Sequence, residues 1–306
     1  MSMVRSVVGR HVSARVRSTL TCGSQSHKAT GREDGHVHSI TRRKSLGLFS
    51  ASCLLYPSLP GRLVATAASY PETAEEVLVN PEFPEAWPYT SEAFQRFDET
   101  SDSDFYEQPR FVTHIDDMAI KALTEFYQES FPPSGTGAAI LDMCSSWISH
   151  YPAGYEASRI SGTGMNEEEL KRNSILTDYS VRELNEEPKL PYPDNTFDVV
   201  TNAVSIDYLV KPLEIMDEVL RVLKPGGLAI MSFSNRCFPT KAVSIWTATG
   251  DLDHVYIVGS YFHYAGRGGS TRFEPPAAKE ITKKGLLGAK GDPMYVVYAR
   301  KQNVDF

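Results

Sequence analysis

Two stretches of the sequence decide the fold: residues 190–200 read LPYPDNTFDVV, and residues 218–228 read EVLRVLKPGGL. The first passes from a turn rich in Pro and Asp into an apolar, β-branched run, which predicts a buried strand over 197–204. The second ends a segment, 213–223, whose apolar residues recur at helical spacing. The glycine pair that follows is expected to end this helix and to let the chain reverse into a strand over 228–233.

Strand and helix patterns alternate on both sides of these stretches. Residues 116–127 have apolar side chains close to helical spacing, and Asn166 precedes a second helix as its N-cap, with Glu169 in the capping-box position. Strands that alternate with helices predict an α/β fold with a doubly wound, mostly parallel sheet. In chain order, seven strands are predicted at 138–142, 159–162, 179–182, 197–204, 228–233, 255–264 and 294–299.

The two quoted stretches resemble, in this order, the strand-four and strand-five signatures of the class I S-adenosylmethionine-dependent methyltransferases. They are most similar to the type 11 (UbiE-like) group, which includes the ubiquinone and menaquinone C-methyltransferases, and the resemblance covers about 138–235. It implies a Rossmann-like sheet of seven strands that binds S-adenosyl-L-methionine and transfers its methyl group to a small-molecule acceptor. The transfer would be a direct displacement, in which the protein aligns donor and acceptor and excludes water.

The first strand ends at Asp142, where an acid would attract the ammonium or sulfonium charge of the cofactor, because ligands of such sheets lie beyond the carboxyl ends of the strands. The family's next loop reads acid-x-Gly-x-Gly, but residues 142–150 read DMCSSWISH and contain no glycine. Ser145 and Ser146 are expected to take over through their hydroxyls and backbone N–H groups. This run resembles that of an uncharacterised plastid and cyanobacterial subgroup.

The ends of the next strands supply the other expected cofactor contacts. The second strand of the family ends on an acid that binds the ribose, and here Gly164 or Asn166 falls at that place. Asn166 could bind a ribose hydroxyl, or it could serve only as a helix N-cap. After the third strand, Glu183 is preferred to Asp178 as the acid near the adenine.

Asn202 follows the fourth strand, and it should either line the cleft or make a strand-end hydrogen bond. The methyl acceptor should bind near the end of the fifth strand, where a base would assist transfer to oxygen or nitrogen. His263 stands in an aromatic run and is a candidate catalytic base, although a core role is the alternative; His150 is a second candidate. The aromatic side chains suggest a quinone or phenolic acceptor. The residues considered for this half of the site are Asn235, Arg236, Cys237, Trp246, His254, Tyr261, His263 and Tyr264.

The charge is divided unevenly along the 306 residues. Residues 1–67 contain ten Lys or Arg and two Asp or Glu, a net charge of +8, whereas the whole chain has −7 and the remainder therefore −15. An acidic body argues against nucleic acid as a partner, and no apolar run is long enough to span a membrane. Cys144 and Cys237 have no zinc or disulfide spacing, so no metal site is expected.

The basic segment, residues 1–67, is typical of a targeting leader. It is rich in Arg and Ser, and it carries the twin arginines Arg42 and Arg43 before a short apolar stretch and a small-residue motif at 65–67. This pattern predicts a transit peptide for the chloroplast, with the thylakoid lumen as one destination and the mitochondrion as the alternative. An irregular arm is predicted over 68–110 with a short helix at 91–97, followed by the methyltransferase domain over 111–301.

Two rival functions remain open on the sequence alone. A degenerate methyltransferase fold without the loop glycines and the ribose acid could be a non-catalytic cofactor-binding or scaffold protein. A nicotinamide-dependent oxidoreductase is the weaker rival, because no G-x-G-x-x-G motif follows a strand.

Overall fold

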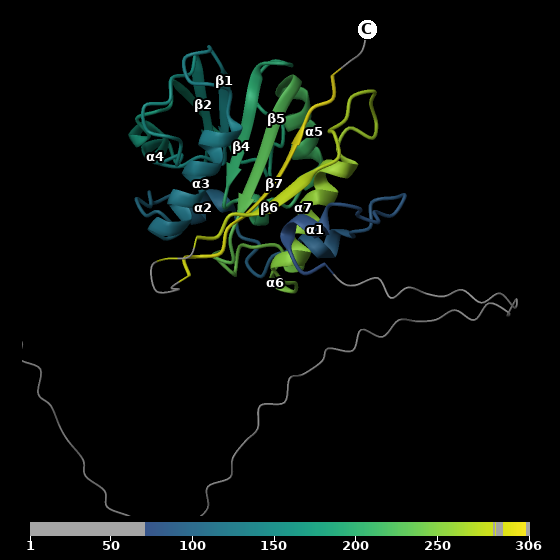
Figure 1. Cartoon of the computed structure of the whole chain (residues 1–306). Coiled ribbons are helices and arrows are strands. Elements are labelled where there is room, and N and C mark those ends of the chain that lie inside the picture. Colours follow the sequence, from purple (N-terminus) through teal and green to yellow (C-terminus); the bar gives the residue numbers. More distant parts are fainter. Residues whose placement is uncertain (1–70, 284, 286–289, 304–306) are drawn as a thin grey trace, which may run out of the picture. The chain divides into compact units, whose positions relative to one another are not determined.

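The computed structural model describes residues 71–283, 285 and 290–303, which build a seven-stranded sheet in the order β3-β2-β1-β4-β5-β7-β6 (Figure 1). The first five strands in the chain pair in parallel, whereas β7 is antiparallel to both β5 and β6. This arrangement confirms the predicted fold class. The strands are β1 (Ala139–Met143), β2 (Arg159–Gly164), β3 (Asp178–Val181), β4 (Phe197–Ala203), β5 (Leu223–Phe233), β6 (Ala277–Glu280) and β7 (Tyr295–Arg300).

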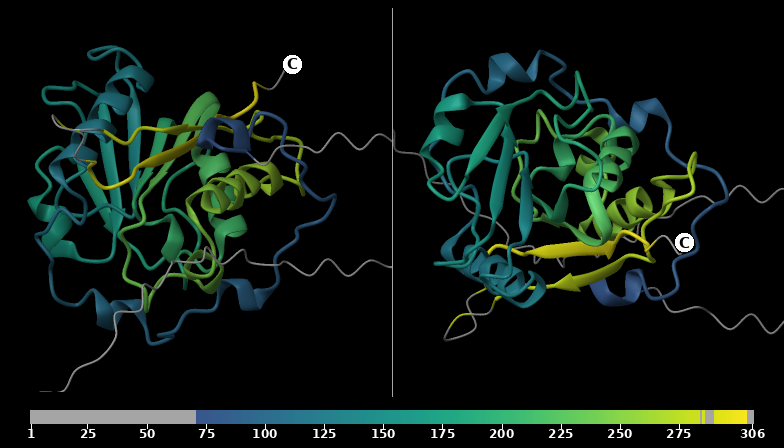
Figure 2. Two further views of the ribbon diagram at one scale, coloured as in Figure 1. Left: turned by 60° about the horizontal axis from the view of Figure 1, so that its bottom comes forward. Right: turned by 90° about the horizontal axis from the view of Figure 1, so that it is seen from above.

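Helices cover both faces of the sheet (Figure 2). Adjacent residues of a strand point to opposite faces of the sheet, and each face has its own cluster of buried apolar side chains. Ile140 belongs to the cluster with α3 (Asp117–Ser130). Leu141 belongs to the cluster with α5 (Pro212–Val222) and α7 (Asp251–Tyr264). Both clusters are apolar and closely buried, which fixes the register of the strands between them. The remaining helices are α1 (Ala74–Val77), η1 (Ser91–Phe94), α2 (Asp102–Phe105), α4 (Glu167–Arg172), η2 (Ile206–Tyr208) and α6 (Ser244–Thr247).

The predicted strand over 255–264 is wrong, because these residues form most of α7. The β-branched and aromatic side chains of this segment suggest a strand. The helix is buried on almost every side, so its sequence lacks the alternation of polar and apolar faces that identifies a surface helix. The sixth strand is instead β6, a short edge strand in which Ala278 alone is buried. Such a strand leaves no apolar pattern in the sequence.

The helix predicted over 213–223 is confirmed within one residue as α5. The glycine pair after it lies inside an irregular start of β5, where the pairing with β4 shifts between Leu223 and Leu228. Gly226 takes a φ of +75°, which only glycine adopts easily. The sequence thus places the reversal correctly, but the strand begins five residues earlier than predicted.

The arm runs across α7 and then along the edge of the candidate site. Phe83 and Trp87 lie against Tyr264 of α7, and α1 contacts both α7 and β6. The sequence predicts a short helix at 91–97, and the structure has η1 there. The predicted leader, 1–67, lies outside the described residues.

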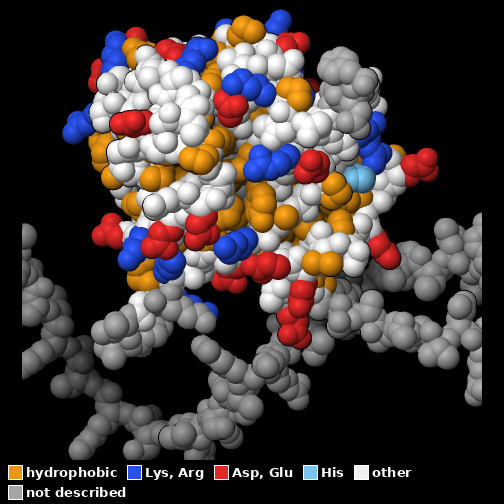
Figure 3. Space-filling view, turned by 45° about the horizontal axis from the view of Figure 1, so that its top comes forward, with side chains coloured by type: hydrophobic (Ala, Val, Ile, Leu, Met, Phe, Trp, Pro, Cys, Tyr) orange, Lys and Arg blue, Asp and Glu red, His pale blue; other side chains and the backbone are white. Residues whose placement is uncertain are grey.

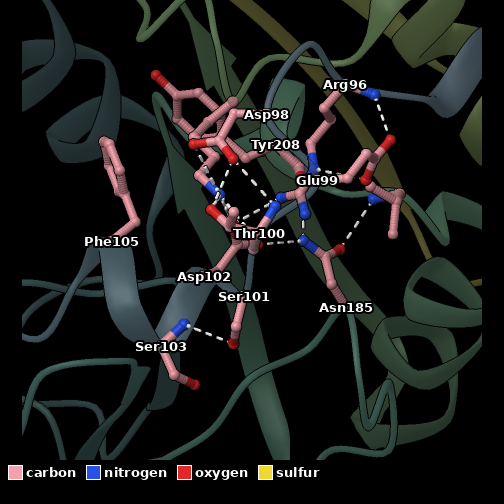
Figure 4. A network of polar contacts seen from close by, with 12 residues as sticks. Arg96, Asp98, Glu99, Thr100, Ser101, Asp102, Ser103, Phe105, Asn185 and Tyr208 are labelled. Carbon is pink, nitrogen blue, oxygen red and sulfur yellow. Dashed lines mark hydrogen bonds and ion pairs between the residues drawn. The ribbon is translucent and has the colours of Figure 1, made fainter.

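A buried ionic network fixes the second half of the arm (Figure 4). Arg96 donates from Nη1 to both carboxylate oxygens of Asp102, at 2.7 and 2.6 Å. Lys241, which is 1% exposed, lies 3.3 Å from the same carboxylate and donates to the carbonyl of Thr100 at 2.6 Å. Asn185, which follows β3, donates to Asp102 at 3.0 Å. One carboxylate therefore joins the arm to the segments after β3 and β5.

The surface drawn in Figure 3 mixes both signs of charge. Lys and Arg side chains alternate there with Asp and Glu, and hydrophobic side chains lie between them. The acidic excess of the body is therefore not gathered on this face.

Replacing Asp102 by Asn should destabilise the protein by about 3–5 kcal/mol, because Arg96 and Lys241 would lose the buried carboxylate that they share. They would keep only the more exposed Glu99 and Asp98, at 3.6 and 3.4 Å. The free energy of unfolding from urea titration tests this. Asp104→Asn on the exposed side of α2 is the matched control and should change stability by less than about 0.5 kcal/mol. Equal effects of the two changes would contradict the importance of the network.

Candidate functional site

A cavity of about 410 Å³ lies beyond the carboxyl ends of the parallel strands. This is the place where open α/β sheets bind ligands, and the volume lies within the usual range for small-molecule sites. The ends of β1 to β5 form one side, and residues between Asp102 and His114, from the end of the arm and the segment before α3, form the other. The arm is therefore part of the cavity wall.

The loop after β1 makes its tight turn without glycine. Cys144 adopts a φ of +57°, the left-handed region that glycine usually supplies. The N–H of Ser145 then donates to the carbonyl of Thr163 on β2 at 2.6 Å, and its hydroxyl donates to Asp142 at 2.6 Å. Burial raises the pKa of the Cys144 thiol to about 12, which disfavours the nucleophilic thiolate form.

Residues with a positive φ gather around the cavity. Five non-glycine residues of the described chain have such a φ, and four of them line the cavity: His114, Cys144, His150 and Val204. Each conformation costs free energy, most of all for the β-branched Val204. Such strain is typical of functional sites, where the surrounding structure holds residues in defined positions.

Asp142 lies in the cavity wall as predicted and is only 3% exposed. Its carboxylate accepts hydrogen bonds from Ser145 at 2.6 Å and from Thr201 at 3.3 Å. Burial still dominates and raises its pKa to about 6. A buried carboxylate without a cation beside it would gain from a positively charged ligand.

Ser146 also lines the cavity, and its hydroxyl donates to Glu169 at 2.6 Å. Glu169 projects from α4, is 7% exposed, and also accepts the N–H of Arg110 at 2.6 Å. The sequence identified Glu169 only as a capping-box residue, and no such box forms. Its burial among polar groups depends on how α4 packs against the first loop, which no sequence signal reveals.

Asn166 lines the cavity, but its amide group is already fully engaged. Its oxygen accepts the N–H groups of Glu168 and Glu169, and its nitrogen donates to the carbonyls of Tyr106 and Glu107. The N-cap role is therefore the one that the structure supports. Gly164 offers no alternative, because a Cβ there would overlap the carbonyl oxygen of Ser145.

Glu183 lies directly after β3 and lines the cavity. One carboxylate oxygen accepts the N–H of Asn185 at 2.8 Å, and the other has no hydrogen-bond partner among the described residues. Burial raises the pKa of this carboxyl group. Asp178, the other candidate, instead pairs with Arg159 at 2.8 Å on the strand itself.

Two predicted site residues do not reach the cavity. Asn202 is fully buried in β4 and donates to the carbonyl of Met143 at 3.2 Å, which is the strand-end hydrogen bond considered as the alternative. His263 lies on α7, stacks on Phe83 with centroids 4.5 Å apart and bonds Arg267 at 2.7 Å. The structure therefore gives His263 no contact with the site.

Near the end of β5, the structure separates the acceptor candidates into two groups. Asn235, Arg236 and Cys237 line the cavity. The other aromatic and histidine candidates do not, because they pack in the core around α6 and α7: Trp246, His254, Tyr261 and Tyr264.

Two histidines of the cavity wall come from outside the predicted aromatic run. His150 is buried, and burial together with nearby His114 lowers its pKa to about 4. His114 lies between the arm and α3, 5.5 Å from the ring of Phe238, which follows β5. Burial lowers its pKa as well, so both imidazoles are neutral at pH 7.

The described ranges contain no group of three or more His, Cys, Asp or Glu side chains placed to hold a metal ion. Among the helices of the same ranges, none combines the length and the apolar character that crossing a membrane requires.

Comparison with known proteins agrees with this architecture. The type 11 "Methyltransferase domain" family model matches residues 144–231. The chain is 50% identical over 46 residues to the ubiquinone/menaquinone biosynthesis C-methyltransferase of a Ruegeria species, covering 15% of this chain and 18% of that protein. It is 35% identical over 101 residues to the demethylmenaquinone methyltransferase of Bacillus licheniformis, covering 31% and 44%. These matches span less than half of the length of either relative.

Among solved structures, a methyltransferase from Archaeoglobus fulgidus is 12% identical with a TM-score of 0.43, covering 59% of this chain and 94% of that one.

The family match includes both stretches that decide the fold, and it confirms the resemblance drawn from them. Residues 144–231 therefore match the type 11 methyltransferase-domain family, and this match supports a class I S-adenosylmethionine-dependent methyltransferase.

The raised pKa of Asp142 predicts that Asp142→Asn stabilises the ligand-free protein above pH 6. Burial raises the pKa of the folded carboxyl group from its ordinary value of 3.8 to about 6, so wild-type stability falls as the pH rises through that window. At pH 8 the variant should exceed the wild type by about 1–3 kcal/mol, and the difference should vanish toward pH 4.

Urea titrations at several pH values measure this difference. Asp178→Asn is the control with the opposite sign, because Arg159 holds the pKa of Asp178 below its usual value. That variant should lose stability at pH 8. A pH-independent effect of Asp142→Asn would contradict the burial of a charged carboxylate.

Proposed function

We propose that this protein is a methyltransferase that uses S-adenosyl-L-methionine to methylate a small-molecule acceptor. One observation carries the proposal: three carboxylates line a single cavity, with Asp142 and Glu183 at the ends of β1 and β3 and Glu169 on α4, the helix that follows β2. They match the order of a cationic amino-acid group, a ribose and an adenine. The family of residues 144–231 supports the same conclusion.

The residues present fit this cofactor. Asp142 is a buried carboxylate without a cation, which suits the ammonium or sulfonium charge. Glu169 can accept ribose hydroxyls, because Gly164 cannot be replaced by an acid. Glu183 lines the cavity after β3, where its carboxylate can accept an N–H of adenine. When bound, S-adenosylmethionine supplies a methyl group on a sulfonium. The chain's own task is to hold and align both partners and to exclude water.

For the acceptor, we propose a planar phenolic or quinone-like molecule. Tyr106, Tyr208 and Phe238 line the half of the cavity near the ends of β4 and β5, and flat aromatic walls favour a planar ligand. The names of the matched relatives, which are quinone-biosynthesis methyltransferases, point in the same direction.

Isothermal titration of the purified protein with S-adenosylhomocysteine tests the function. Micromolar binding that weakens in Asp142→Ala is expected. The second candidate function is a non-catalytic scaffold, and the glycine-free loop after β1 favours it. Absence of binding heat at high micromolar cofactor would support the scaffold and contradict the enzyme.

Glu169→Gln should weaken S-adenosylhomocysteine binding by about 10- to 100-fold, because a hydrogen bond to a charged group contributes about 1.5–3 kcal/mol. The neighbouring Glu168→Gln is the matched control, since Glu168 is exposed and should leave affinity unchanged. The 2′-deoxy and 3′-deoxy analogues identify the contact. Wild type should bind them more weakly than the parent, and Glu169→Gln should not; undiminished discrimination in the variant would rule out a ribose contact.

For localisation, we propose the chloroplast. The support is the sequence of residues 1–67, with its basic, Arg- and Ser-rich composition and its twin arginines. Import of the full chain into isolated chloroplasts and mitochondria, followed by fractionation of stroma and lumen, tests this proposal. Import into mitochondria alone would contradict it.

A further inference from the structure

Arg110 is a cation of the cavity wall without an ion pair. Three arginines line the cavity. Arg182 pairs with Glu187, and Arg236 lies 3.6 Å from Asp292, but the guanidinium of Arg110 forms no ion pair with any residue that the structure describes. A half-buried cation that lacks a counter-ion is costly, and a bound anion would offset that cost.

The position of the guanidinium is fixed by two aromatic rings. Its central carbon lies 4.0 Å from the ring centroid of Phe105 and 5.0 Å from that of Phe238. These are cation–π distances, and they hold the side chain without using its hydrogen-bond donors. Guanidinium carries five N–H groups, and Nη2 donates to the carbonyl of Phe105 at 3.1 Å. Donors therefore remain free, in the fork geometry that matches a carboxylate.

The surroundings place this cation in the acceptor half of the cavity. Phe238 follows β5, and the ring of His114 lies 5.5 Å from it. Phe238 therefore contacts both the guanidinium of Arg110 and the ring of His114. Glu169 accepts the backbone N–H of Arg110 at 2.6 Å, but among the described residues it forms no ion pair with the guanidinium. The other two carboxylates of the cavity, Asp142 and Glu183, belong to the ends of β1 and β3. An anion bound by Arg110 would thus sit beside flat aromatic side chains.

We infer that Arg110 recognises an anionic oxygen of the methyl acceptor, and that the acceptor is a planar aromatic acid, a carboxylate or a phenolate. This inference rests on the proposed function and narrows its acceptor class. A carboxylate could also come from the amino-acid part of the cofactor, and the experiment separates the two sources. A neutral quinone acceptor is the competing outcome.

The test measures binding to the protein saturated with S-adenosylhomocysteine, with 4-hydroxybenzoate as the anionic probe and 4-hydroxybenzamide as its neutral counterpart. Wild type should bind the benzoate at least about tenfold more tightly, as expected for a charge-assisted bidentate contact. Arg110→Met should abolish this preference, and Arg110→Lys should retain part of it as a point charge. Arg172→Met is the matched control, because Arg172 stacks on Phe111 at 4.4 Å outside the cavity and should leave the preference intact.

A second titration compares S-adenosylhomocysteine with its decarboxylated analogue. If Arg110 serves the acceptor, Arg110→Met should keep the wild-type discrimination between the two. Loss of that discrimination with an unchanged benzoate preference would overturn the inference and assign Arg110 to the cofactor. Equal binding of benzoate and benzamide by wild type, or binding of neither, would also overturn it. Failure of wild type to bind S-adenosylhomocysteine at all would instead contradict the proposed function.

Discussion

The candidate site depends on one close contact between the first loop and the second strand. Ser145 donates its N–H to the carbonyl of Thr163 at 2.6 Å, and its own carbonyl oxygen lies where a Cβ at position 164 would be. Because the two backbones touch, Gly164 cannot be replaced by the acid that this fold usually places there. The acid comes instead from α4, since Glu169 reaches the same loop through Ser146. The missing acid at the end of β2 therefore has a steric cause.

The sequence predicts those helices that are buried on one side only and those strands that are bounded by turns. β4 and α5 follow from 197–204 and 213–223, because a turn precedes the strand and an apolar stripe marks the helix. The same reasoning fails for α7, which is enclosed on nearly all sides by the arm and the sheet and so carries no period. The positions of Asp142 and Glu183 in the cavity wall can be predicted from the topology, because each follows a parallel strand. Glu169 and His114 do not, because their approach to the cavity depends on packing between distant segments.

The arm contributes to the wall of the cavity that lies opposite the strand ends. A parallel sheet presents only the ends of its strands to a ligand, and the opposite wall must come from elsewhere. Here residues between 102 and 114 form that wall, and the Asp102 carboxylate fixes them to segments after β3 and β5 through Asn185 and Lys241. These anchors are ionic and buried, so the wall is held at defined points and not by a continuous apolar face. Breaking them would loosen the acceptor half of the cavity first.

The two walls of the cavity carry charges of opposite sign. Asp142 and Glu183 lie at the ends of β1 and β3 and Glu169 lies on α4, whereas the guanidinium of Arg110 lies on the arm, between the rings of Phe105 and Phe238. A cationic donor and an anionic acceptor would each find the opposite charge in the wall, and each would be oriented toward the other. Charges interact more strongly where water is excluded, because the local dielectric constant is lower. The arm that carries Arg110 is also the wall that limits the entry of water, so one segment would both recognise the acceptor and strengthen its attraction to the donor.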